Sequence, residues 1–225
     1  MFTSIAPHYD FLNHLLSLNL DRRWRRVAAR LALDGAAAPP RLLDLCTGTG
    51  DLALELARRS PQARIAGLDF VLPMLERLAA KTRRAGLAAR IHPLCGDGFH
   101  LPYRDAAFDA VTVAFGLRNL SPVEPAIDEV ARVLRPGGRF VILEFALPKR
   151  GLWARLYALY FFRVLPKIGK WISRTSAYTY LPASVAVFLE PPELSATLLR
   201  HGFAEAAWRP LAGGVLAVHV ARRAK

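Results

Sequence analysis

The sequence predicts an α/β fold: a mostly parallel seven-stranded sheet with an antiparallel edge strand and helices on both faces. Near-continuous apolar runs alternate with helical patterns from residue 41 to residue 145, which is typical of a parallel sheet covered on both faces. A Gly-rich turn joins the first strand to a helix in "LLDLCTGTGDLA". Near the end, "FAEAAWRP" and "GVLAVHVA" flank "LAGG", and this hairpin pattern supplies the antiparallel edge strand.

The elements follow in order along the chain. Residues 5–34 carry apolar side chains at helical spacing, with Asp21 as a plausible N-cap. The Ala- and Pro-rich stretch 35–40 is expected to be a loop. The sequence then predicts strands over 41–46, 64–69, 90–95, 108–115, 137–145, 203–210 and 214–221, and helices over 51–59, 71–85 and 122–134.

One segment interrupts this alternation. Residues 151–182 concentrate aromatic and basic side chains between the fifth strand and the last helix. We expect a single domain over residues 1–225, with 1–38 as an N-terminal helical cap and 151–182 as an insertion. The composition of the insertion suits a lid or a membrane-contacting surface, and an ordinary packing helix is the alternative.

Charge and composition narrow the partners. The chain has 225 residues and a formal net charge of +13, which favours an anionic partner. Basic residues are scattered and no zinc-finger or RNA-binding signature occurs, so a membrane surface is preferred over nucleic acid or an unfocused background charge. We find no secretory signal, no 18-residue apolar span and no metal-ligand spacing among the histidines. With two cysteines expected to be reduced core residues, the prediction is a cytoplasmic protein held peripherally at the membrane.

The glycine-rich turn points to a cofactor. Gly48, Gly50 and Ala53 fit the G-x-G-x-x-G/A pattern of dinucleotide sites. Asp51, directly after Gly50, would repel a diphosphate at the helix N-terminus. S-adenosylmethionine (SAM) has no phosphate and carries a sulfonium and an ammonium group, so carboxylates such as Asp51 and Asp44 suit it. The residues therefore favour SAM, with a dinucleotide as the alternative.

Two further acids close neighbouring strands. Asp69 ends the second strand and can accept hydrogen bonds from ribose hydroxyls. Asp97 follows the third strand beside Gly98, where it could receive an adenine amino group. Helix capping or a turn is the alternative for any single aspartate. Because the carboxyl ends of parallel strands meet at one edge, Asp44, Asp69 and Asp97 together predict one acidic crevice.

Several motifs resemble a known family. "LLDLCTGTGD", "GDGFHLPY", "FDAVTVAFGLRNL", "VLRPGGRFVILEF" and the opening "FTSIAPHYDFLNHLLS" are similar to the class I SAM-dependent C-methyltransferases of ubiquinone and menaquinone biosynthesis, over essentially the whole chain. The resemblance implies a Rossmann-like class I methyltransferase fold, SAM as co-substrate, and a prenylated demethylmenaquinol or benzoquinol as methyl acceptor. It also adds Thr49 to the cofactor-binding set of Asp69, Asp97 and Gly98.

The pair Arg118 and Asn119 follows the fourth strand in "FGLRNL". Arginine stays protonated in proteins and cannot act as a simple base. We therefore expect Arg118 to hold the quinolate oxygen of the acceptor as an ion pair and Asn119 to orient its second oxygen or a water. A salt bridge from Arg118 to an acidic neighbour such as Glu144 is the alternative.

Other assignments stay open. Tyr9, His8 and Asp97 are candidates for receiving the acceptor proton, and Tyr9 is named first, as an orienting group. A nucleic-acid methyltransferase would normally carry a motif such as N-P-P-[YF] after the fourth strand, where this chain has "FGLR". A non-catalytic SAM-binding module is a third hypothesis. The ring type, the length of the prenyl tail and whether the chain forms a homo-oligomer are not decided by the sequence.

Overall fold

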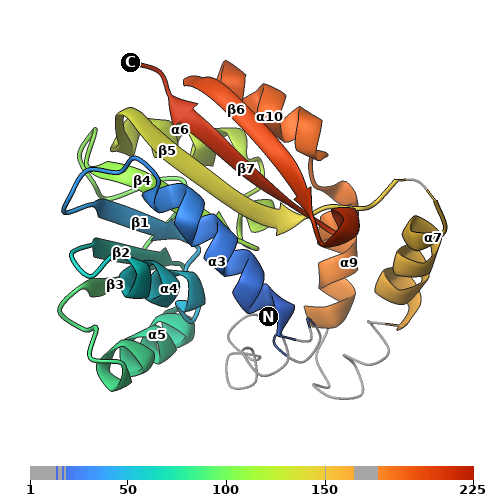
Figure 1. Ribbon diagram of the computed structural model, residues 1–225, viewed down its shortest axis with the longest axis horizontal. Coiled ribbons are helices and arrows are strands. Elements are labelled where there is room, and N and C mark those ends of the chain that lie inside the picture. Colours follow the sequence, from blue (N-terminus) through green and yellow to red (C-terminus); the bar gives the residue numbers. More distant parts are fainter. Residues whose placement is uncertain (1–13, 15–16, 18, 150, 165–176) are drawn as a thin grey trace.

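Seven strands form one sheet in the order β3-β2-β1-β4-β5-β7-β6 in a computed structural model of the chain (Figure 1). The structure describes residues 14, 17, 19–149, 151–164 and 177–225. Neighbouring strands from β3 to β5 pair in parallel, whereas β7 is antiparallel to both β5 and β6. The strands are β1 (Arg41–Leu45), β2 (Arg64–Asp69), β3 (Ile91–Cys95), β4 (Phe108–Ala114), β5 (Leu134–Phe145), β6 (Phe203–Leu211) and β7 (Leu216–Arg223).

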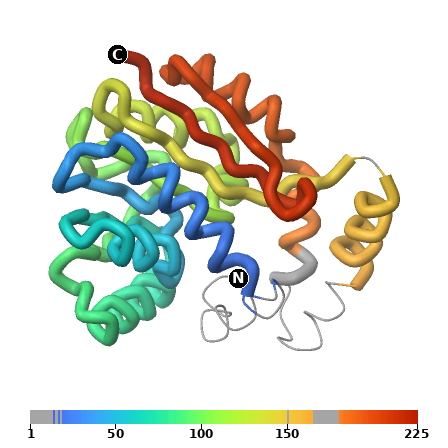
Figure 2. The backbone as a smooth tube through the Cα atoms, viewed as in Figure 1, coloured from blue at the N-terminus to red at the C-terminus, as the bar shows by residue number. Residues whose placement is uncertain are grey.

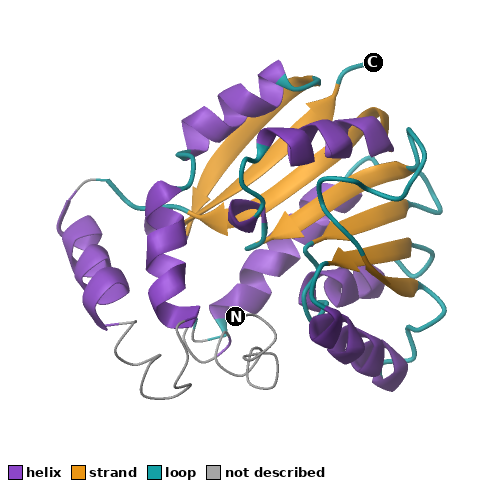
Figure 3. Ribbon diagram, turned by 180° about the vertical axis from the view of Figure 1, so that it is seen from behind, coloured by secondary structure: helices purple, strands orange, loops and turns teal. Residues whose placement is uncertain are grey.

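Helices cover both faces of the sheet (Figures 1 and 3). On one face, α3 (Leu20–Leu33), α4 (Asp51–Arg59) and α5 (Leu72–Arg84) bury their apolar sides against the strands. The blue trace of α3 crosses the front of the sheet in Figure 2 and packs on β4, β5 and α4. On the other face lie α6 (Glu124–Val133) and α10 (Pro191–Arg200).

The remaining helices lie near the carboxyl ends of the parallel strands. They are the short helix η2 (Leu117–Asn119), α7 (Gly151–Leu159), the π-helical turn η3 (Tyr160–Val164), α9 (Ala177–Val187) and, in the β6–β7 turn, η4 (Ala212–Gly214). Buried Tyr157, Phe161 and Val185 join α7, η3 and α9 in a small separate core. The predicted insertion 151–182 therefore contains helices on either side of residues 165–176, which lie outside the described residues.

The sheet and its strand types confirm the predicted fold class. The antiparallel strand itself is β7, one place in from the edge, because β7 pairs with β5 and leaves β6 outermost. Both edge strands contain a proline, Pro93 in β3 and Pro210 in β6. The prediction that both cysteines are core residues is wrong for Cys95, which is exposed at the end of the edge strand β3.

The predicted N-cap of the first long helix is also wrong. Asn19 occupies the N-cap position of α3, and Asp21 lies in the first turn. Asp21 is buried and accepts hydrogen bonds from Ser17 and Arg25, and His14 lies beside it. Burial alone would raise the pKa of Asp21, but Arg25 holds that pKa below its usual range. The acid therefore anchors α3 by an internal ion pair.

Within the part of the chain that the structure describes, we find no helix of the length and apolarity needed to cross a bilayer.

Candidate functional site

The predicted site residues that the structure describes lie at or just after the carboxyl ends of the parallel strands. The chain leaves β1 toward β2 on one side and returns to β4 on the other, and ligands of open α/β sheets bind where the strand order reverses in this way. Asp44 lies near the end of β1, Asp69 ends β2, and η2 follows β4. The edge thus gathers groups from strands far apart in the sequence.

The turn between β1 and α4 has the backbone geometry of a ligand-binding loop. Gly48 has φ of +55° and Gly50 has φ of +85°, a region that favours glycine. A Cβ on Gly50 would lie 2.0 Å from Cδ1 of Leu78 on α5, whereas a Cβ on Gly48 would meet no atom within 4 Å. Gly50 therefore lets α4 and α5 approach, and Gly48 faces open space where a ligand could reach the backbone.

Asp69 ties this loop to β2. Its Oδ2 accepts a hydrogen bond from the backbone N–H of Gly48 at 2.7 Å, and its Oδ1 accepts one from Val71 at 2.9 Å. Burial raises the pKa of Asp69, although these backbone donors oppose the shift. A carboxylate oxygen has two lone pairs, so each oxygen retains acceptor capacity for a ribose hydroxyl.

Asp44 is a buried carboxyl group beneath the loop. The hydroxyl of Thr47 donates to its Oδ2 at 2.6 Å, and the hydroxyl of Thr112 donates to its Oδ1 at 2.7 Å. Burial raises the pKa of Asp44 to about 6 despite these two hydrogen bonds. Among the described residues, no cation lies within ion-pair distance of Asp44. A cationic ligand would stabilise its ionised form.

Basic side chains that the sequence analysis did not single out contact Asp51 in the first turn of α4. Lys81 of α5 donates to Thr49 Oγ1 at 3.0 Å and to Asp51 Oδ1 at 2.7 Å. Arg25 Nη1 lies 3.7 Å from Asp51 Oδ2, and His14 Nε2 lies 3.6 Å from it. Burial would raise the pKa of Asp51, but the charges of Arg25 and Lys81 hold it below its usual range. The charge of Asp51 is thus already balanced inside the protein.

The first turns of α3 and α4, together with His14, also bring together ligand atoms that could hold a metal ion. His14, Asp21 and Asp51 each offer one such atom within 4.8 Å of the others. Arg25 contacts both carboxylates, so a resident guanidinium already supplies the positive charge there.

Asp97 lies at the rim of the crevice. Its carboxylate is half exposed, accepts a hydrogen bond from the Phe99 N–H at 2.9 Å, and has His100 Nδ1 at 3.3 Å. The Phe99 N–H, followed by His100, lowers the pKa of Asp97. A Cβ on the adjacent Gly98 would lie 3.1 Å from Leu120. The carboxylate is therefore ionised at neutral pH and accessible, and its contact with adenine stays a prediction.

Arg118 adopts the alternative arrangement named above. Its Nη1 lies 3.0 Å from both carboxylate oxygens of Glu144 and also donates to the backbone oxygen of Phe115. Its Nε donates to Ser184 of α9 at 3.3 Å, and the guanidinium lies 5.5 Å from the ring centre of Phe145. The side chain is 8% exposed and that of Glu144 is 2% exposed. Arg118 is thus a buried, oriented cation, and the contacts of Nε and Nη1 leave its Nη2 as the donor for a ligand.

Asn119 links the site to the insertion. Its Oδ1 accepts a hydrogen bond from the Tyr180 hydroxyl of α9 at 2.9 Å. Tyr9 and His8, the predicted groups for proton handling, lie outside the described residues. Tyr180 and Ser184 come from α9, from which no site residue was predicted, and the folded chain brings them to Asn119 and Arg118.

Cys46 lies between these groups. Burial, followed by the nearby charges of Asp69, Asp44 and Glu144, raises the pKa of its thiol, while Arg118 opposes the shift. A Cβ on Gly116 would lie 2.4 Å from Cβ of Cys46, so the glycine loop and the segment leading into η2 are in close contact. The charges of three carboxylates and of Arg118 thus all act on this one thiol.

Known proteins are similar to this chain in sequence or in fold. A model described as the ubiE/COQ5 methyltransferase family matches residues 1–223. A demethylmenaquinone methyltransferase of Thermus thermophilus is 50% identical over 99% of this chain and 100% of its own length. A ubiquinone/menaquinone biosynthesis C-methyltransferase of Geotalea daltonii is 42% identical over 99% of this chain and 94% of its own. The crystal structure of a SAM-dependent methyltransferase from Aquifex aeolicus superposes with a TM-score of 0.61 at 17% identity, covering 82% of each chain.

Proposed function

The chain belongs to the ubiE/COQ5 methyltransferase family, and we propose on this basis that it transfers a methyl group from SAM to a ring carbon of a demethylmenaquinol. The full-length likeness to a demethylmenaquinone methyltransferase supports this acceptor. The structural observation that carries the proposal is the juxtaposition at one sheet edge of carboxyl groups suited to a sulfonium donor and an oriented arginine suited to a quinolate.

The carboxyl edge of β1, β2 and β3 fits SAM. The open approach to Gly48 admits a ligand to the loop backbone, and the remaining acceptor capacity of Asp69 suits ribose hydroxyls. The exposed Asp97 at the rim suits an adenine amino group. Buried Asp44 lacks an ion-pair partner among the described residues and favours a positively charged ligand. Bound SAM supplies an electrophilic methyl group.

The acceptor reacts through carbon. Loss of a hydroxyl proton gives a quinolate, whose oxygen increases the electron density at the neighbouring ring carbon. That carbon forms a bond to the methyl group as the carbon–sulfur bond breaks, and sulfur keeps the electron pair. The ring carbon then loses its own proton and aromaticity is restored. The protein has to stabilise the quinolate and hold the reacting atoms in line.

Arg118 is the residue that we assign to the quinolate oxygen. Glu144 acts as a positioning residue, because it fixes the guanidinium through Nη1 and leaves Nη2 to donate. The Glu144 carboxylate also offsets part of the positive charge, so orientation of the donor matters as much as attraction. We assign Asn119, anchored by Tyr180, to the second oxygen or a water, and Tyr9 to orienting the acceptor.

The prenyl tail of the acceptor places the substrate in a bilayer, and α7 suits a peripheral contact with that bilayer. Exposed apolar side chains recur at helical spacing on α7 and continue into η3: Leu152, Trp153, Leu156, Leu159 and Phe162. Such a face inserts into the boundary between headgroups and acyl chains without spanning the membrane. The net charge of +13 adds attraction to anionic lipid.

Methyl transfer from labelled SAM to a short-chain demethylmenaquinol tests the function, with a demethylated benzoquinol and an RNA as parallel acceptors. We expect label in the naphthoquinol product. Label in RNA alone, or in neither quinol, would contradict the proposal. Transfer to the benzoquinol as well would extend the acceptor class.

The same assay tests the role of Arg118. Loss of a preorganised oxyanion donor lowers turnover by about 100- to 1,000-fold, so Arg118→Ala should lose that much while still binding SAM. Arg118→Lys keeps the charge but not the two-sided guanidinium contact, and its loss should be smaller. Calorimetric SAM binding shows that each variant is folded. Wild-type turnover in Arg118→Ala would remove Arg118 from the mechanism.

A further inference from the structure

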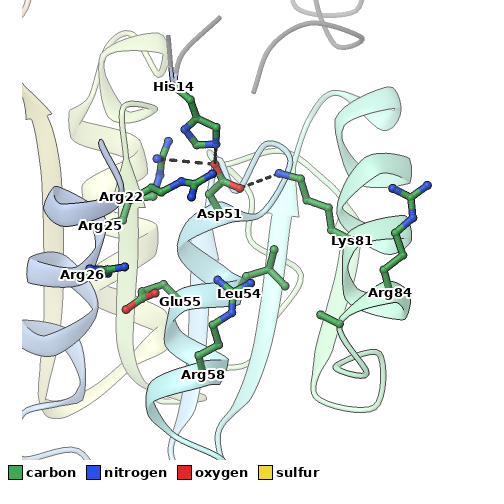
Figure 4. Close-up of a pocket in the computed structure, with 11 residues that line it drawn as sticks. His14, Arg22, Arg25, Arg26, Asp51, Leu54, Glu55, Arg58, Lys81 and Arg84 are labelled. Atoms are coloured by element: carbon green, nitrogen blue, oxygen red, sulfur yellow. Dashed lines mark hydrogen bonds and ion pairs between the residues drawn. The ribbon is translucent and has the colours of Figure 1, made fainter. Parts of the chain in front are cut away.

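A basic groove begins at the first turn of α4, beside the site at the carboxyl edge, and extends along α3, α4 and α5. It is a cavity of about 490 Å³ between α3, α4 and α5 (Figure 4). We define the basic groove by its lining residues: His14, Arg22, Arg25, Arg26, Asp51, Leu54, Glu55, Arg58, Lys81, Arg84 and Ala85. Six cationic side chains and only two carboxylates line this cavity.

The two ends of the basic groove differ in how their charges are balanced. At the inner end, Asp51 contacts both Lys81 and Arg25, so positive and negative charges meet. Toward the outside lie four arginines from three helices: Arg22 and Arg26 on α3, Arg58 on α4 and Arg84 on α5. Glu55, the only carboxylate near them in the lining, pairs instead with Arg59.

None of these four arginines forms an ion pair with any residue whose position the structure describes. Like charges that line one cavity repel each other, and a bound anion would reduce that repulsion. The guanidinium group matches phosphate oxygens with paired N–H donors. The cavity is lined by arginines from three helices. It therefore suits a phosphate group better than a small carboxylate or an apolar ligand.

We propose that the basic groove binds the phosphate of an anionic membrane lipid and forms a second bilayer contact in addition to that of α7. This inference rests on the proposed function, because a prenylated acceptor brings the protein to a bilayer. In Figures 1 and 3, α5 and α7 lie at opposite ends of the molecule. Two separated contacts, one apolar and one cationic, would hold the carboxyl edge of the sheet in a fixed orientation to the membrane.

The test compares two triple variants with equal loss of charge. The groove variant is Arg26→Ala/Arg58→Ala/Arg84→Ala, and none of these residues belongs to the catalytic machinery. The control variant replaces three exposed arginines that lie outside the groove and form no ion pair with a described residue: Arg64→Ala/Arg104→Ala/Arg209→Ala. Flotation uses phosphatidylcholine vesicles with and without phosphatidylglycerol, at low and high salt.

We expect the wild type and the control variant to float with the phosphatidylglycerol vesicles. A basic residue near an anionic surface contributes about 1 kcal/mol, so the groove variant should bind these vesicles about 100-fold more weakly. High salt should remove most of the difference, because screening weakens exposed charge interactions. Methyl transfer to a short-chain acceptor without vesicles should stay at the wild-type level in both variants.

Other results overturn the inference. Equal flotation of the groove variant and the wild type would show that the groove does not bind lipid. Titrations with inorganic phosphate and with an RNA oligomer test other occupants. If the wild type binds one of these and the groove variant does not, while both float equally with vesicles, the groove binds that ligand and not lipid. If even the wild type fails to float while methyl transfer is normal, the lipid site is rejected and the enzymatic function stands.

Discussion

At the scale of single residues, the buried Asp44 has the most direct consequence for ligand binding. Its carboxyl group lies between two threonine hydroxyls, and burial raises its pKa to about 6. A raised pKa means that the folded protein takes up this proton more readily than the unfolded chain. The contribution of Asp44 to the free energy of unfolding is therefore larger at pH 5 than at pH 7.

Affinity for SAM should follow the opposite trend. The cationic ligand prefers the ionised carboxylate, so its affinity should fall by about tenfold between pH 7 and pH 5 as Asp44 becomes neutral. Titration calorimetry across this range measures the slope, and Asp44→Asn should bind more weakly with a flatter profile. Asp97→Asn serves as the comparison, because the pKa of Asp97 is lowered and its removal should leave the slope in place. A wild-type affinity independent of pH would contradict the role of Asp44.

The place of a residue in the site could be predicted where its neighbours in the sequence form a motif or a strand end, and not where its place depends on packing. Asp69 and Asp97 follow strands, so the order of the strands was enough to place them at one edge. The contact of Lys81 with the first turn of α4 depends on how α5 packs beside α4, and nothing near Lys81 in the sequence marks it. The Arg118–Glu144 pair joins η2 to the strand β5, and this contact between separate elements was only an alternative in the sequence analysis.

At the scale of elements, the packing of α5 against the glycine loop explains why two similar glycines differ. Gly50→Ala would place a methyl group against the buried Leu78 in addition to a left-handed backbone strain of about 1–2 kcal/mol. Gly48→Ala carries the backbone strain alone. Thermal unfolding should therefore show a larger loss of stability for Gly50→Ala. In a Leu78→Ala background, the difference in lost stability between the two substitutions should become smaller. Equal losses of stability in the native background would show that the contact with Leu78 does not determine the effect of Gly50→Ala.

Apolar periodicity in the sequence predicts some of the helices well and others poorly. The helices α4 and α5 show strong apolar periodicity and lie close to their predicted bounds. The insertion has apolar and aromatic residues around most of the helix circumference, and α9 carries Pro182 in its interior. Periodicity therefore could not indicate which side of α9 faces Arg118 and Asn119. The N-cap of α3 was misassigned because Asp21 is bound by side chains rather than by the helix N-terminus.

At the scale of the whole molecule, α7 lies apart from the main sheet (Figure 1) and carries exposed apolar side chains. Leu152 is 71% exposed and Leu156 is 53% exposed. If this surface inserts into lipid, Leu152→Ser/Leu156→Ser should weaken binding to neutral vesicles by about 30-fold, at roughly 1 kcal/mol for each partly buried leucine. Val187→Ser/Leu199→Ser, two exposed apolar residues outside α7, provides the matched control. Vesicle co-sedimentation with fluorescence detection measures both, and equal binding would place the contact elsewhere.

The two edge strands affect how neighbouring copies of the protein could pair if they bind to a membrane surface. Adsorption on a membrane raises the local concentration of the chain, and an open sheet edge is a template for fibrous aggregation. The edge strands β3 and β6 each contain a proline, which has no N–H to donate to a neighbouring strand. Exposed Arg209 adds charge beside Pro210. If the protein gathers on a bilayer as we propose, these prolines and this charge would hinder strand pairing between neighbouring copies.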